Sequence, residues 1–158
     1  MTNAVLLDNV THKDLRVKTG FTAEFGDSVN PGRVFPTELA FIPREYPIFF
    51  RRNNKGEYQA VALLGLDKGE NLFLSEPRWN ARYVPAAQQR APFLIGLHQG
   101  QEEGEENREP MIHVDLDHPR ISFEEGTQAF LPHGGNSPYL EHVSRMLQII
   151  YHGTELAV

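Results

Sequence analysis

Cysteine is absent from this chain of 158 residues. A chain without cysteine forms no disulfide framework, no thiolate zinc site and no cysteine nucleophile. The first residues, MTNAVLLDNVTHKD, also lack the basic start and the long apolar run of a signal peptide. Both absences fit a protein of a reducing compartment, and we expect a cytoplasmic location.

Long apolar runs and basic stripes are missing as well. No 18 consecutive residues are apolar, so we expect no membrane insertion. Lysine and arginine are not concentrated in any one segment, so we expect no nucleic-acid partner. With 40% hydrophobic and 23% charged residues, the composition is ordinary for a soluble globular protein, and the length predicts one domain.

The acidity of the chain is concentrated in one segment. Residues 99–109, QGQEEGEENRE, hold five Glu and one Arg and so carry −4 of the formal net charge of −6. The segment offers no apolar residue to bury. We interpret it as a solvated or disordered loop, with an acidic docking patch as the alternative.

The stretch from Tyr46 to Leu74 predicts the core of the fold. Two apolar runs, Tyr46–Phe50 and Tyr58–Leu66, flank the sequence NNKG, whose residues tolerate the positive φ of tight turns, so the runs predict a hairpin. Residues 60–66 are apolar without interruption, which favours a strand covered on both faces. A third short run follows at Leu72–Leu74.

The rest of the chain predicts short elements around this core. We expect a single α+β domain over residues 1–158, with a mainly antiparallel sheet, short helices and a C-terminal helix. The expected elements are a short strand at 15–18, a helical turn after Pro36, a short helix begun by Pro85, a strand at 93–97 and a helix from Tyr139 with Ser137 as its N-cap.

The C-terminal helix carries more apolar residues than one stripe holds. Met146 and Ile149 lie beside the main stripe, and one stripe suffices to dock a helix on a sheet. Because monomers seldom leave large apolar patches in water, we expect Met146 and Ile149 to form an interface, through self-association or with a protein partner. The chain ends at Thr154–Val158 without a closing cap, so we also expect it to be truncated.

Trp79 and Tyr83 are the candidate ligand-binding residues. Both side chains are amphipathic aromatics in a segment outside the expected strands, and such side chains suit a binding pocket. The alternative is that both pack over the sheet with their polar tips hydrogen-bonded.

His113 and Asp115 are the candidate metal ligands. Residues 111–117 alternate with period two, which places His113 and Asp115 on one face of a strand. A His-x-Asp pair on one face begins a two-His-one-carboxylate iron triad, and the chain offers His133, His142 and His152 downstream as a third ligand. A strand with one solvated face gives the same pattern without any metal.

Motifs spread through nearly the whole chain resemble those of the SapC family of bacterial proteins. The motifs are HKDLRV (12–17), YPIFF (46–50), AVALLGL (60–66), GENLFL (69–74), WNARYVP (79–85), PFLIG (92–96), MIHVDLDHPR (111–120) and GGNSPYLEHV (134–143). Members of the family are usually longer, and this chain is similar to their amino-terminal two thirds. The resemblance assigns no catalytic residue and no cofactor.

The resemblance implies an association rather than a reaction. The family takes its name from a surface-layer-associated gene. Its members are encoded near flavin-dependent halogenase-like proteins, cupin-like oxygenases and TonB-dependent receptors. We therefore expect a non-catalytic accessory or interaction protein that serves such a system. The alternatives are a small-ligand-binding module around Trp79 and Tyr83, and a metal-dependent oxygenase-like enzyme that uses His113 and Asp115.

Overall fold

The computed structural model describes residues 2–42, 44–98 and 109–156. The chain separates into two compact units, one of residues 1–18 and 91–144, the other of residues 19–90 and 145–158. All strand pairs in the described residues are antiparallel, and the longest helix is the C-terminal one. The predicted α+β class is confirmed. The single domain over residues 1–158 stays a prediction.

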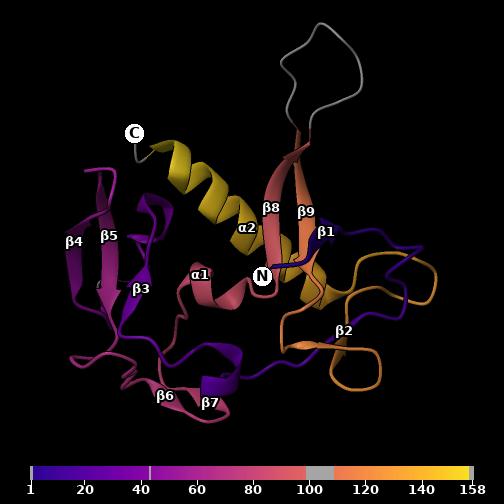
Figure 1. Cartoon of the computed structure of the whole chain (residues 1–158), viewed down its shortest axis with the longest axis horizontal. Coiled ribbons are helices and arrows are strands. Elements are labelled where there is room, and N and C mark those ends of the chain that lie inside the picture. The colour runs from indigo at the N-terminus through magenta and orange to yellow at the C-terminus, as the bar shows by residue number, and fades with distance from the viewer. Residues whose placement is uncertain (1, 43, 99–108, 157–158) are drawn as a thin grey trace, which may run out of the picture. The chain divides into compact units, whose positions relative to one another are not determined.

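The second unit is built on a three-stranded sheet in the order β3-β5-β4 (Figure 1). Its other elements are short. The elements are the 3₁₀ helices at Ala23–Phe25 and Pro36–Glu38, β3 (Pro31–Arg33), β4 (Ile48–Arg52), β5 (Tyr58–Leu63), β6 (Leu74–Ser75), β7 (Arg78–Trp79) and α1 (Ala86–Gln89).

Strands β4 and β5 form the predicted hairpin. Five residue pairs join them, from Ile48 opposite Ala62 to Arg52 opposite Tyr58. The turn closes where Asn53 donates its N–H to the Glu57 carbonyl at 2.8 Å, and Gly56 adopts a φ of +86° that favours glycine. The polar NNKG sequence was therefore a reliable turn signal.

The hairpin differs from the sequence prediction in how much of it is buried. Val61, Ala62 and Leu64 are buried, so the middle of the second apolar run is covered on both faces as predicted. The strand ends at Leu63, however, and Leu66 is exposed. The first run was expected to be core, yet Phe50 is 73% exposed.

The hydrophobic core of the second unit includes Ala62 of β5 and Leu64 just after that strand. Its buried residues come from positions 34 to 79 and pack against the ring of Phe21, which lies edge-on to Trp79 with ring centroids 5.3 Å apart. The buried set is Val34, Ile42, Tyr46, Ala62, Leu64 and Trp79. The core thus lies at the end of the hairpin that holds Tyr46 and Leu64, and the end with the turn extends beyond it.

The first unit contains two small sheets, in the orders β1-β9-β8 and β10-β2-β11. The strands are β1 (Ala4–Leu6), β2 (Arg16–Val17), β8 (Phe93–His98), β9 (Glu109–Asp115), β10 (Ile121–Ser122) and β11 (Thr127–Gln128). The predicted strands at 15–18 and 93–97 correspond to β2 and β8. The buried ring of Phe93 lies 6.3 Å from the ring of Tyr139.

Helix α2 (Pro138–Leu156) begins as the sequence predicts. Ser137 Oγ accepts the N–H of Leu140 at 3.1 Å and so caps the helix. Its first residues, up to Ser144, count with the first unit and those from Arg145 with the second. Neither α2 nor any other helix in the described part of the chain is long and apolar enough to cross a membrane.

Candidate functional site

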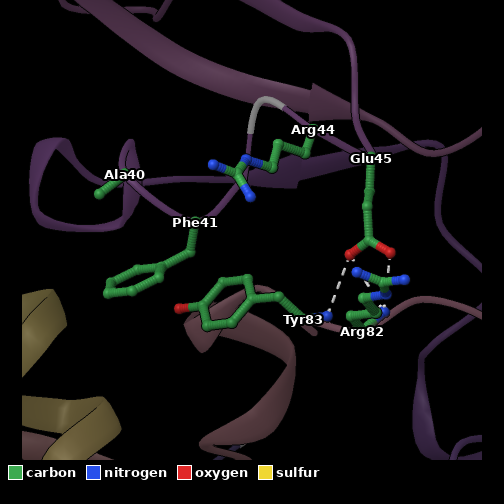
Figure 2. Close-up of a pocket in the computed structure, with 6 residues that line it drawn as sticks. All are labelled: Ala40, Phe41, Arg44, Glu45, Arg82 and Tyr83. Carbon is green, nitrogen blue, oxygen red and sulfur yellow. Dashed lines mark hydrogen bonds between the residues drawn. The ribbon is translucent and has the colours of Figure 1, made fainter.

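The second unit contains a pocket of about 660 Å³. It lies where the segment after the Pro36–Glu38 helix meets the segment before α1 (Figure 2). Its lining residues are Ala40, Phe41, Arg44, Glu45, Arg82 and Tyr83. This volume falls in the range of pockets that bind small molecules.

Tyr83 is held in place at three atoms. Its N–H donates to Glu45 Oε2 at 3.1 Å, its carbonyl accepts from the Tyr46 hydroxyl at 2.5 Å, and its own hydroxyl donates to Glu38 Oε1 at 2.8 Å. Because backbone and side chain are both fixed, the Tyr83 ring forms a rigid wall of the pocket.

Glu38 is the buried centre of this arrangement, with none of its surface exposed. Its Oε2 accepts the N–H of Phe35 at 2.9 Å, which caps the 3₁₀ helix, and its Oε1 accepts from the Tyr83 hydroxyl and from the N–H of Ala86 at 2.7 Å. These donors belong to two separate segments. A single carboxylate therefore ties the 3₁₀ helix to the start of α1.

Trp79 lies behind the pocket rather than in it. Its side chain is buried, and its indole N–H donates to the Tyr46 hydroxyl at 2.8 Å, which donates in turn to the Tyr83 carbonyl. Burial raises the pKa of Tyr46 to about 12, so the hydroxyl stays protonated near neutral pH and keeps both bonds. Burial, with the neighbouring Glu38 charge, also raises the pKa of Tyr83.

The open side of the pocket combines aromatic surface with positive charge. The rings of Phe41 and Tyr83 are stacked, with centroids 5.7 Å apart and an angle of 28°. Figure 2 shows the Arg44 side chain extending toward this pair of rings. Arg44 and Arg82 are exposed, and within the described ranges neither guanidinium forms an ion pair or a hydrogen bond.

Glu45 does not neutralise these two arginines by direct contact. Its carboxylate accepts the backbone N–H of Arg82 at 2.9 and 3.0 Å and the N–H of Tyr83 at 3.1 Å. Backbone amides thus occupy both oxygens and tie Glu45 to the segment before α1.

Of the two residues that the sequence indicated for a pocket, Tyr83 lines one and Trp79 supports it from the core. Binding of a ligand stays a prediction.

The sequence missed most of the pocket. Phe41 lies within the helical turn expected after Pro36, Arg44 and Glu45 follow that turn, and none of the three gave a signal of its own. Glu38 stands three residues after Phe35, in the helical turn that Pro36 begins. A glutamate at this position often caps a helix start, and that pattern could have drawn attention to Glu38.

A second surface of the second unit is the outer edge of β4, which we call the β4 edge (Ile48–Arg52). In the described part of the chain β5 is the one strand paired with β4. Leu63 donates to the Pro47 carbonyl at 2.9 Å and Asn53 donates to Glu57, so alternate pairs between them are the hydrogen-bonded ones. The peptide groups of Ile48, Phe50 and Arg52 therefore point away from β5.

Side chains give the β4 edge a basic and aromatic character. Phe49, Phe50, Arg51 and Arg52 are all exposed, and the turn adds Lys55. Arg52 lies 6.0 Å from the Tyr58 ring centre and donates to the Gly56 carbonyl at 2.9 Å. Glu57 is the acidic residue of this hairpin. The hairpin is thus positively charged in a chain whose net charge is −6.

His113 and Asp115 lie on β9 of the first unit. His113 Nδ1 is 3.2 Å from the Met111 carbonyl, and a Cβ at Gly96 would come within 2.6 Å of the His113 ring. Asp115 Oδ1 accepts the N–H of Asn3 at 2.9 Å and of Asp117 at 3.2 Å. No group of three or more possible metal ligands occurs in residues 2–42, 44–98 and 109–156. The metal role of His113 and Asp115 stays a hypothesis.

Met146 and Ile149 both lie in the second half of α2. Met146 is buried, with 7% of its surface exposed, and Ile149 is partly buried. The Ile149 carbonyl accepts the Thr37 hydroxyl at 2.7 Å. Their role in an interface stays a prediction, and Ile149 offers more surface for it. The acidic segment lies outside the described residues, apart from Glu109.

A family model described as SapC matches residues 7–157 of the chain. The match covers nearly the whole sequence and confirms the resemblance inferred from the motifs. No curated protein and no solved structure matches the chain.

Proposed function

Because the chain belongs to the SapC family, which its match over residues 7–157 establishes, we propose that it acts as a non-catalytic accessory protein that binds a protein partner. The binding surface is the β4 edge, and the partner adds an extended segment to it as a further strand. The observation that carries this proposal is the row of outward-pointing peptide groups at Ile48, Phe50 and Arg52.

Two features favour a specific partner over unspecific aggregation. An exposed edge strand is a template for pairing, and proteins often protect such edges with charges. Here Arg51 and Arg52 provide the charge, while Phe49 and Phe50 offer apolar contacts to the right partner. A segment with acidic side chains satisfies both the backbone and the arginines.

A second copy of the chain fits this edge poorly. Antiparallel pairing of two β4 strands about Phe50 would place Arg52 opposite Ile48 and Arg51 opposite Phe49 of the other copy. Arg51 of one copy would then lie diagonally across from Arg51 of the other on the same face, within reach of long side chains, and this like-charge pair disfavours the ribbon. The partner that we propose is therefore a different protein, with an acidic segment. The family resemblance makes halogenase-like proteins, cupin-like oxygenases and TonB-dependent receptors the partners to look for.

Capture from native lysate with matched variants tests this function. The full chain, Phe50→Ser and Arg51→Glu are compared with Phe123→Ser, because Phe123 is similarly exposed (60%) but belongs to the first unit. We expect the full chain and Phe123→Ser to capture the same proteins. Phe50→Ser should capture about tenfold less of them, as for a central contact residue. Equal capture by all four proteins would contradict the proposal.

A further inference from the structure

The geometry points to the pocket of Ala40, Phe41, Arg44, Glu45, Arg82 and Tyr83 as a binding site for a small planar aromatic carboxylate. This pocket is lined by the segments before β4 and before α1, and its ligand would be a small molecule rather than the proposed protein partner. It rests on the charge, the aromatic surface and the rigidity of the lining residues.

The charge of the lining residues favours an anion. Arg44 and Arg82 carry two exposed guanidinium groups without a hydrogen-bonded or ion-paired neighbour in the described parts of the chain. The Glu45 carboxylate is used by the backbone N–H groups of Arg82 and Tyr83. A guanidinium binds a carboxylate through two parallel hydrogen bonds, so a carboxylate suits either arginine.

The aromatic surface favours a flat ligand. Phe41 is 57% exposed although its ring stacks on that of Tyr83. An exposed aromatic ring beside a cationic group offers a stacking surface for another ring and a charge for its carboxylate. In Figure 2 the Arg44 side chain extends toward the two rings.

The rigidity of Tyr83 makes the site ready for a ligand. Three hydrogen bonds fix its backbone and hydroxyl, and two of their partners, Glu38 and Tyr46, are buried. The ligand then does not have to order this wall on binding, which lowers the entropic cost.

Calorimetric titration of the full chain with 2-naphthoate tests the site. The comparison ligands are 2-naphthamide, which is flat but uncharged, and cyclohexanecarboxylate, which is charged but not flat. We expect 2-naphthoate to bind at least about tenfold more tightly than either. Arg44→Gln should weaken 2-naphthoate about tenfold, while Arg78→Gln, an exposed arginine outside the pocket, should leave it unchanged.

Phe41→Leu separates stacking from charge. It should weaken 2-naphthoate about three- to tenfold and leave cyclohexanecarboxylate unchanged. Equal binding of 2-naphthoate and 2-naphthamide would overturn the inference, and so would a lack of saturable 2-naphthoate binding up to about 10 mM. If 2-naphthoate does not bind but Arg44→Gln abolishes capture of a partner protein, the pocket is a protein contact instead. The calorimetric outcomes do not depend on the β4 edge, because they need no partner protein.

Discussion

The hydroxyl of Tyr83 should stabilise the second unit measurably, and Tyr83→Phe removes it without changing the ring. The hydroxyl donates to Glu38 Oε1 at 2.8 Å, and Glu38 is fully buried. Without this donor, Oε1 keeps the N–H of Ala86 as its one remaining partner in the described residues. A hydrogen bond to a charged group contributes about 1.5 to 3 kcal/mol. For a chain of this length that corresponds to a fall in Tm of about 3 to 12 °C.

Tyr58→Phe is the matched control for this measurement. Tyr58 is 70% exposed, so loss of its hydroxyl should change stability by less than about 0.5 kcal/mol. Thermal unfolding followed by circular dichroism measures both variants under one condition. If Tyr83→Phe lowers Tm no more than Tyr58→Phe does, the hydrogen bond to Glu38 contributes nothing and the account of the rigid wall is wrong.

Three further predictions concern Gly153, two buried tyrosines and Ile149. Gly153→Ala should lower Tm although alanine favours helices, because the new Cβ would lie 2.5 Å from the Phe35 Cβ. Such overpacking costs about 1 to 3 kcal/mol. Gln148→Ala, on the exposed face of the same helix, is the control and should not lower Tm. Burial raises the pKa of Tyr46 and of Tyr139 to about 12. Their contribution to stability is therefore complete below the ordinary pKa of about 10 and is lost as pH rises toward 12. Ellipticity should fall in that range, and an ellipticity unchanged up to about pH 12 would contradict this prediction. Ile149→Glu should weaken any self-association seen by light scattering at micromolar concentration, while the fold persists. Met146→Glu, in contrast, would bury a charge and unfold the second unit. A protein that is monomeric with and without Ile149→Glu would show that Ile149 forms no interface.

The hairpin could be predicted from the sequence because its signals are local. Two apolar runs and the NNKG turn lie within some twenty residues, and the structure pairs them as expected. The exposure of Phe50 could not be predicted in this way. An apolar side chain is buried only where another element covers it, and the sequence does not state which strand ends the sheet.

The pocket could be predicted only in part for a similar reason. Tyr83 drew attention as an amphipathic aromatic, but its three partners come from positions 38, 45 and 46, in a segment well before it. Such a network depends on long-range packing, which no local pattern reports. The N-cap Ser137 of α2, by contrast, was predicted because capping depends on neighbours in sequence.

Hydrogen exchange at the β4 edge tests the central claim most directly. The amides of Ile48, Phe50 and Arg52 point away from β5 and should exchange quickly in the free chain. If a captured partner adds a strand to this edge, these three amides should become protected in the complex, with little change at Phe49 and Arg51, which already pair with β5. A complex in which Ile48, Phe50 and Arg52 exchange as fast as in the free chain would contradict the account.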